Sequence, residues 1–190
     1  MTKLELINLA LMKCGLPLAA ALNEVDWNAQ LAFEPMARQC LRSFAWGFAT
    51  RFEKLALAPQ MPAHGFTHAY RLPERCLRII DVRQQEDLRA PRARYVVAGR
   101  LLHCNVSPCN ARYIYDELDC ENWPDDFADA VAGHIAAQIA NLSTQTMSMT
   151  PGLLQMAQLA LAQAQAVDAS ETTERVPLDE SILMARGGAQ

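Results

Sequence analysis

The sequence predicts an α+β fold, because helical periodicity at both ends of the chain encloses a middle segment with strand periodicity. Apolar residues recur every three to four positions before residue 58 and after residue 123, whereas period two appears between residues 76 and 115. We expect a bundle of about four helices with an inserted small antiparallel β-sheet and an extended C-terminal tail. The expected parts are N-terminal helices (1–58), an arginine-rich β insertion (59–122), a C-terminal helix pair (123–174) and the tail (175–190).

A first short amphipathic helix is predicted over about residues 3–14. Thr2 and Glu5 have the spacing of a capping box, in which each side chain accepts a hydrogen bond from the other's backbone amide. Gly15 permits the left-handed turn that ends many helices, and Pro17 prevents continuation.

A second helix is predicted from near Asp26 to Phe44, and Pro35 inside it predicts a kink or a late start. Three aromatic residues follow within a short motif: Phe44, Trp46 and Phe48. We interpret them as core anchors where the helix ends, with a ligand-stacking platform as the alternative.

The β insertion is expected to be an antiparallel meander of three or four short strands. Residues 76–83 alternate in the manner of a strand, residues 95–102 form two strands joined at Ala98-Gly99, and residues 112–115 form a further strand.

Two alanine-rich helices are predicted after the sheet, and their small side chains permit close approach. The first begins at Pro124 and the second at Pro151. Their expected buried stripes are Ala128, Val131, Ile135, Ile139 and Leu142 in the first, and Leu153, Ala157, Ala160, Ala164 and Val167 in the second.

Composition excludes several classes of protein. Hydrophobic residues make up 51% and charged residues 20% of the 190 residues, which excludes wholesale disorder. No run of 18 apolar residues occurs, so we expect no membrane span. The first fifteen residues are expected to be a cytosolic helix and not a signal peptide, because Glu5 and Asn8 interrupt the apolar run. The six cysteines form no CxxC pair and are interpreted as reduced, mostly buried thiols.

The charge is distributed unevenly along the chain. Residues 38–112 contain 13 Lys or Arg and 5 Asp or Glu, whereas residues 113–190 contain 2 and 12. Such a division suits contacts between copies of one chain through complementary faces, or contact with nucleic acid. The arginines that we expect to face a neighbouring subunit or DNA are Arg78, Arg83, Arg92 and Arg94.

Signals of enzymatic or metal chemistry are weak. His103, Cys104 and Cys109 resemble half of a zinc site or the thiol of a small enzyme, but no second pair of ligands completes them. His64 and His68 lie beside Pro62 and Gly65, where a helix is unfavourable. The acidic residues between 116 and 129 lack the calcium-loop pattern, and no phosphate-binding or nucleophile-elbow motif occurs. We therefore expect no catalytic residue, no metal and no cofactor.

In their order and spacing these segments resemble the tail tubular protein A family, the head-to-tail adaptors (connectors) of short-tailed bacteriophages. The resemblance runs from Leu6 to about Gly187. It is carried by the Ile7–Leu11 helix, Leu41–Ala49 with Arg51 and Leu55–Leu57, Tyr70–Pro73 with Cys76–Arg78, the 95–102 hairpin, the 112–115 strand, the alanine-rich helix pair and Ala185–Gly187.

The resemblance implies a structural virion protein without catalysis, assembled in the host cytoplasm. It implies a homododecameric ring that joins the portal to the tail nozzle protein and leaves a channel for double-stranded DNA during ejection. The C-terminal tail would pack against portal subunits through Ile182, Leu183, Met184 and Arg186. The alternative is a non-specific DNA-binding module that uses the arginine-rich sheet.

Overall fold

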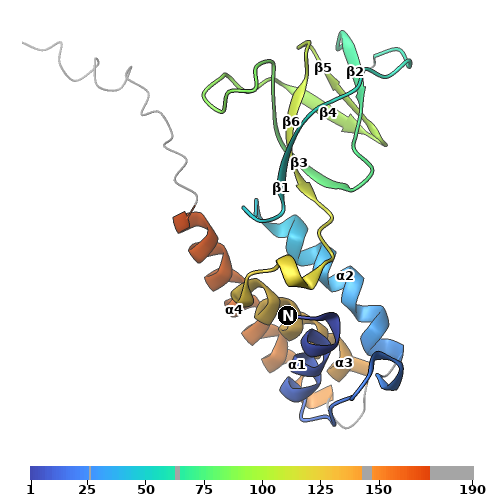
Figure 1. Cartoon of the computed structure of the whole chain (residues 1–190), viewed down its shortest axis with the longest axis vertical. Coiled ribbons are helices and arrows are strands. Elements are labelled where there is room, and N and C mark those ends of the chain that lie inside the picture. The colour runs from blue at the N-terminus through green and yellow to red at the C-terminus, as the bar shows by residue number, and fades with distance from the viewer. Residues whose placement is uncertain (26, 63–64, 143–146, 172–190) are drawn as a thin grey trace, which may run out of the picture.

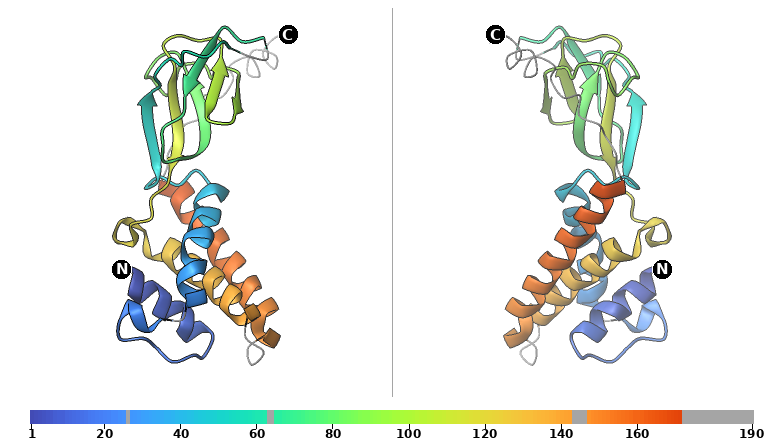
Figure 2. Two further views of the ribbon diagram at one scale, coloured as in Figure 1. Left: turned by 90° about the vertical axis from the view of Figure 1, so that its right-hand side faces the viewer. Right: turned by 90° about the vertical axis from the view of Figure 1, so that its left-hand side faces the viewer.

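The computed structural model describes residues 1–25, 27–62, 65–142 and 147–171, which form two parts (Figure 1). The first part, called here the helical body, contains α1 (Lys3–Lys13), α2 (Trp27–Ser43), α3 (Asp125–Leu142) and α4 (Thr150–Glu171). The second, called here the β module, contains the strands between residues 50 and 115 and lies at one end of the helical body (Figure 2). The predicted α+β fold class is confirmed.

α3 is the central helix of the helical body, and α1, α2 and α4 all pack against it. Its residues are buried on almost every side, as expected for a helix surrounded by others. A Cβ added at Gly133 would lie 2.9 Å from the Cβ of Ala157, so the backbones of α3 and α4 approach closely. The small side chains of both helices therefore determine how near α4 can lie.

The helix ends follow the local sequence signals. The Thr2 side chain accepts from the Glu5 amide and the Glu5 carboxylate accepts from the Thr2 amide, which completes the predicted capping box. Gly15 has a φ of +68° immediately after α1. α2 begins at Trp27, so Pro35 lies inside the helix and does not delay its start. Single turns of 3₁₀ helix are η1 (Leu22–Glu24), η2 (Cys120–Asn122) and η3 (Met147–Met149).

The β module consists of two three-stranded antiparallel sheets. The first has the order β1-β6-β3, with β1 (Thr50–Lys54), β6 (Asn110–Tyr115) and β3 (Cys76–Arg83). The second has the order β2-β5-β4, with β2 (His68–Arg71), β5 (Leu101–Cys104) and β4 (Tyr95–Ala98). The β module therefore begins at residue 50 and not at the predicted boundary of 59.

The predicted meander is wrong in its connectivity. The β4–β5 hairpin forms as expected, with Ala98 opposite Leu101 and Gly99 at a φ of +61°. However, β3 pairs with β6 and β5 pairs with β2, so the hairpin belongs to a different sheet from the strands that flank it in sequence. β1 was missed because four of its five residues are exposed and give no alternation.

The two sheets enclose an apolar core of their own. Its buried members are Leu55, Tyr70, Val82, Leu102, Cys104, Cys109 and Ala111. A single small sheet would leave its apolar face in water, whereas two facing sheets bury both inner faces. The core of the helical body is a separate cluster, which reaches the β module through Ile114 of β6.

Candidate functional site

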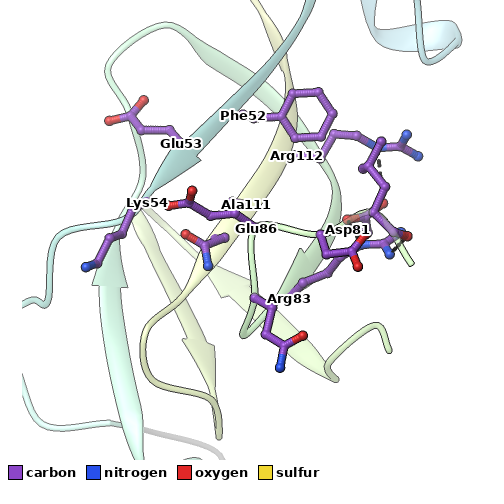
Figure 3. Close-up of a pocket in the computed structure, with 12 residues that line it drawn as sticks. Phe52, Glu53, Lys54, Asp81, Arg83, Glu86, Ala111 and Arg112 are labelled. Atoms are coloured by element: carbon purple, nitrogen blue, oxygen red, sulfur yellow. Dashed lines mark hydrogen bonds and ion pairs between the residues drawn. The ribbon is translucent and has the colours of Figure 1, made fainter. Parts of the chain in front are cut away.

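A buried carboxylate holds three arginines of the β module together. Asp81 on β3 is 3% exposed, and its Oδ1 lies 3.1 Å from Nε of Arg83. Its Oδ2 lies 3.1 Å from Nε of Arg112 (Figure 3). The same oxygen lies 3.9 Å from Nε of Arg92. A buried charge is unfavourable unless it is paired, so these guanidinium groups make the burial of Asp81 possible. We call these four residues the Asp81 cluster.

Arg83 also holds the loop that follows β3. Its Nη1 donates to the backbone oxygen of Ala90 at 2.7 Å and to that of Leu88. Arg83 itself is only 6% exposed. The expectation that Arg83 faces a neighbouring subunit or DNA is therefore wrong, because Asp81 and the loop carbonyls use its donors inside its own chain.

A cavity of about 310 Å³ lies beside the Asp81 cluster, between β1 and the loop after β3 (Figure 3). Glu53, Glu86 and Asp87 line it together with Lys54 and two arginines of the cluster, so charges of both signs are mixed. The described residues that line this cavity include no serine, cysteine or histidine that could act as nucleophile or base. Its composition supports no particular reaction.

A second cavity, of about 380 Å³, lies between β3 and β4 and is called here the arginine groove. Arg42, Arg78 and Arg100 line it, together with the apolar side chains of Leu72, Leu77, Ile79 and Val97 and the ring of Tyr95. The other two predicted arginines, Arg92 and Arg94, are exposed on the segment before β4. The structure therefore separates the four predicted arginines into a buried one, a groove-lining one and two on the surface.

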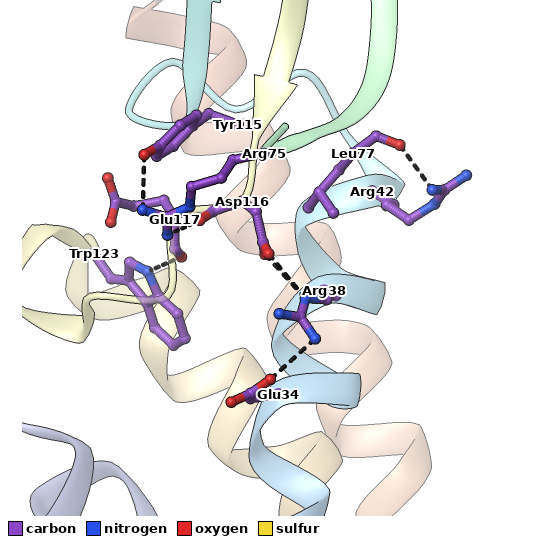
Figure 4. Close-up of polar contacts among 9 residues, drawn as sticks. All are labelled: Glu34, Arg38, Arg42, Arg75, Leu77, Tyr115, Asp116, Glu117 and Trp123. Atoms are coloured by element: carbon purple, nitrogen blue, oxygen red, sulfur yellow. Dashed lines mark hydrogen bonds and ion pairs between the residues drawn. The ribbon is translucent and has the colours of Figure 1, made fainter. Parts of the chain in front are cut away.

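Arginines also fix the β module to the helical body (Figure 4). Nε of Arg38 on α2 donates to both carboxylate oxygens of Asp116, at 3.1 and 3.0 Å. Arg42 donates to the backbone oxygen of Leu77 at 2.7 Å, and Arg75 donates to the Tyr115 hydroxyl at 2.7 Å. The Arg42 contact crosses between the two parts, whereas the Arg38 contact joins α2 to the connection that follows β6. The Arg75 contact lies within the β module, beside that connection. The two chain connections themselves are residues 44–49 and 116–124.

The aromatic motif after α2 lies in the core of the helical body. Trp46 is 1% exposed, and its Nε1 donates to the backbone oxygen of Cys40 at 2.9 Å. Its ring centroid lies 5.2 Å from that of Phe44, 6.1 Å from that of Phe48 and 4.8 Å from that of Phe127. Buried aromatic rings in such edge and tilted contacts are typical of a packed core.

The thiol and histidine candidates are buried. His103, Cys104 and Cys109 all lie in or beside the core of the β module. Burial, with a further contribution from the neighbouring Cys104, raises the pKa of the Cys109 thiol, which opposes formation of a nucleophilic thiolate. Among the described residues no three His, Cys, Asp or Glu side chains are grouped as metal ligands. His64 lies outside the described residues.

α2 and α4 lie on opposite sides of the helical body (Figures 1 and 2), and each carries exposed apolar side chains, called here its apolar face. On α2, Trp27 is 69% exposed and Leu31 follows it one turn later. On α4, Met156 is 67% exposed, and Leu159 and Val167 are also exposed. The prediction that Val167 is buried is therefore wrong, as it is for Leu142 at the end of α3.

A third cavity, of about 340 Å³, lies in the helical body near the start of α3 and is acidic. Asp125, Asp126, Asp168 and Glu171 line it. Asp168 accepts hydrogen bonds from the Gly47 amide at 2.9 and 3.2 Å. Burial raises the pKa of Asp168, the Gly47 hydrogen bond opposes this, and the nearby carboxylates of Glu171 and Asp126 add to it.

Comparisons with known proteins add no identification: no protein-family model matches the chain, and no curated protein matches it. Within the described parts of the chain, no helix is long and apolar enough to cross a membrane.

Sequence reasoning missed the residues that have no local signature. In the sequence, Asp81 occupies an ordinary position in the alternating pattern of a strand. Its role as the counter-charge of the surrounding arginines is visible only from its place between β6 and the loop after β3. The exposed face of α4 did have a signal, because the 18 residues from Thr150 to Val167 contain no charged residue. A solvent-exposed helix face normally carries charges, so this absence could have indicated a partner.

Proposed function

We propose that this chain is a structural head-to-tail adaptor of a short-tailed bacteriophage, located in the neck of the virion. Copies of it form a ring that joins the portal to the tail nozzle and leaves a channel for DNA. The segment order that resembles the tail tubular protein A family motivates the proposal. The observation that carries it is the pair of exposed apolar faces on opposite sides of the helical body.

Two different faces on opposite sides suit repeated head-to-tail association. A face that met a copy of itself would close a dimer, whereas the α2 face of one copy against the α4 face of the next repeats around an axis. Trp27 and Leu31 would then pack against Met156 and Leu159 of the neighbour. Burial of large apolar side chains is the main favourable term in such contacts. The resemblance sets the expected number of copies at twelve.

Charge supports the same arrangement. The acidic cavity of the helical body has four carboxylates, and no basic side chain of the described residues forms an ion pair with any of them. Arg92 and Arg94 are exposed on the β module. Complementary patches of this kind orient subunits and accelerate their encounter. Contacts between copies through these patches should weaken as salt increases.

The partners of the ring remain predictions from the resemblance. The residues assigned to the portal, Ile182, Leu183, Met184 and Arg186, lie outside the described residues. An apolar cluster of this kind in a polar segment can become ordered on a partner.

Mass photometry of the chain alone and with portal tests the proposal directly. The wild-type chain should form oligomers larger than the monomer when portal is added or when its concentration is high. Leu159→Glu should reduce association at least tenfold, because it places a charge in the subunit contact. Gln158→Glu is the matched control, since it adds the same charge at the adjacent exposed position of α4 and should assemble as the wild type does.

Two results would refute the adaptor. One is a chain that stays monomeric at every concentration and never binds portal. The other is a Leu159→Glu variant that associates as the wild type does while its circular dichroism shows an intact fold.

The exposed arginines of the β module favour a second candidate, a non-specific DNA-binding role. They are Arg71, Arg89, Arg92, Arg94 and Arg100. Binding through them should weaken steeply with salt, in proportion to the number of phosphates contacted. Absence of a gel shift with duplex DNA at low salt would eliminate this candidate.

A further inference from the structure

The arginine groove is bordered by one edge strand of each sheet, and on β3 the Leu77 oxygen accepts from Arg42 and the Ile79 oxygen accepts from the Tyr95 hydroxyl at 3.4 Å. β3 is an edge strand of the first sheet and β4 is an edge strand of the second. The two approach at one end, where the Ala93 amide donates to the Val82 oxygen at 2.7 Å. At the other end the cavity lies between them, lined by Leu77 and Val97. Edge strands offer backbone donors and acceptors, so an extended peptide can be added there as a further strand.

The charge of the groove is not balanced within the described residues. Arg42 donates to the Leu77 oxygen and Arg100 to the Pro73 oxygen at 2.8 Å, both of which are neutral carbonyls. Nε of Arg78 is shielded from solvent and has no hydrogen-bond partner there. No described carboxylate forms an ion pair with any of the three. Three cations therefore line one cavity, and the shielded Nε of Arg78 lacks an acceptor, so the groove favours a ligand that carries carboxylates.

The apolar side chains that line the arginine groove narrow the class of ligand that it can bind. Leu72, Leu77, Ile79 and Val97 line the groove beside the arginines, so the ligand also needs apolar side chains. Duplex DNA presents phosphates on a convex surface and requires an exposed row of cations, whereas Nε of Arg78 is covered. An acidic peptide with apolar neighbours fits both properties of the groove.

A segment of this chain has that composition. Residues 176–184, Val-Pro-Leu-Asp-Glu-Ser-Ile-Leu-Met, lie outside the described residues and contain two acidic and no basic side chains. Asp179 and Glu180 are adjacent and have apolar residues on both sides. The flanking basic residues, Arg175 and Arg186, lie outside this stretch.

The end of α4 lies close enough for this segment to reach the groove of its own chain. Gln165 donates to the Ser43 hydroxyl at 3.2 Å, and Ser43 directly follows the groove residue Arg42. Asp168 accepts from the Gly47 amide at 2.9 Å, and the five residues from Arg42 to Gly47 span at most about 18 Å. Glu171 lies six helical residues, about 9 Å, beyond Gln165, and the eight residues from Glu171 to Asp179 can span about 26 Å, so Asp179 can return to Ser43 and Arg42.

We propose that residues 176–184 bind in the arginine groove of their own chain, as an added strand between β3 and β4. Asp179 and Glu180 pair there with Arg78 and its neighbours, and the apolar residues on either side cover Leu77 and Val97. This inference does not depend on the adaptor function. If the portal also binds this segment, the groove and the portal compete for it.

Hydrogen exchange of the full-length chain, measured by mass spectrometry, tests the proposal. The amides of Leu178–Met184 should exchange at least tenfold more slowly than in the free peptide of the same sequence. Substituting both acidic residues, Asp179→Arg with Glu180→Arg, should remove this protection without altering any residue of the described fold. Arg78→Glu should have the same effect, and its combination with the two acidic substitutions should restore protection.

The same hydrogen-exchange measurement provides the control and the results that would overturn the proposal. Arg71→Glu makes the same charge change at an exposed position of β2 and should leave the protection intact. Rapid exchange of the segment in the wild-type chain would overturn the proposal. Protection that appears only as concentration increases would also overturn it, because the occupant would then be a second copy's segment. The monomer suffices for all these measurements, so a failure to form rings would not affect them.

Discussion

The helical body and the β module are stabilised by different kinds of interaction. The helical body packs aromatic and alanine side chains around α3, and apart from thiols its only buried polar or charged side chain within the described helices is His134. The β module instead buries Asp81 and Arg83 at its edge, and its Tyr70 hydroxyl donates to the Val106 oxygen at 2.9 Å. Stability in the first part depends on filling volume, and in the second on pairing polar groups.

The difference follows from the size of the elements. Helices of 11 to 22 residues present enough apolar surface to form a dry core around α3. Strands of four to eight residues bury much less, so the loops that connect them are held by specific donors such as Arg83. All three tryptophans lie outside the strands and all four tyrosines lie within the β module, which gives each part its own spectroscopic probe.

The largest expected effect comes from the aromatic core of the helical body. Phe127 is fully buried, with its ring centroid 4.8 Å from that of Trp46 and 5.1 Å from that of Trp123. Phe127→Ala should lower the free energy of unfolding by about 3–5 kcal/mol, because it removes buried contacts and leaves a cavity. Denaturant unfolding followed by tryptophan fluorescence measures this. Phe52→Ala, at an exposed position of β1, should cost less than about 0.5 kcal/mol.

A smaller loss, confined to the β module, is expected from neutralising Asp81. Asp81→Asn keeps the shape of the side chain but leaves the arginines around it without their counter-charge. Local stability should fall by about 3 kcal/mol, measured by hydrogen exchange of β3 and β6, while the tryptophan signal changes little. Glu86→Gln makes the same charge change at an exposed loop position and should be close to neutral. Equal exchange in both variants would contradict the role assigned to the Asp81 cluster.

The smallest effect is expected between the two parts. Arg38→Met should weaken the coupling of the β module to the helical body by about 0.5–1 kcal/mol, since Arg38 is partly exposed and solvent screens its pair with Asp116. A double-mutant cycle with Asp116→Asn isolates this energy, and it should decrease with added salt. Gln39→Met, at the neighbouring exposed position of α2, provides the control. A coupling energy of zero at low salt would mean that the two chain connections alone fix the β module.

Features encoded by neighbouring residues were predicted well. The Thr2–Glu5 capping box, the stop at Gly15 and the hairpin at Ala98-Gly99 all depend on spacings of a few residues. The close approach at Gly133 and Ala157 followed from the alanine content of two long helices. In each case the backbone preference of the local sequence and the final fold agree.

Features that depend on distant segments were not predicted. β6 lies between β1 and β3, although Thr50 and its partner Ile114 are 64 positions apart in the sequence. The periodicity of α4 predicted the buried face, since Leu153, Ala157 and Ala164 are buried, but it did not show where this burial ends, so Val167 was wrongly assigned to the core. Arg83 was one of several similar arginines in the sequence until its neighbours in space were known.

The sequence by itself determined the α+β class, the helix ends and the charge division, because each of these depends on periodicity, short spacing or composition. Only the tertiary structure decided the division into two sheets, the burial of the Asp81 cluster, the opening of the arginine groove and the two outer apolar faces. The physical reason is that these features depend on contacts between residues far apart in the sequence. Strand pairing, the desolvation of charges and the formation of cavities all require such contacts, and local sequence patterns constrain them only indirectly.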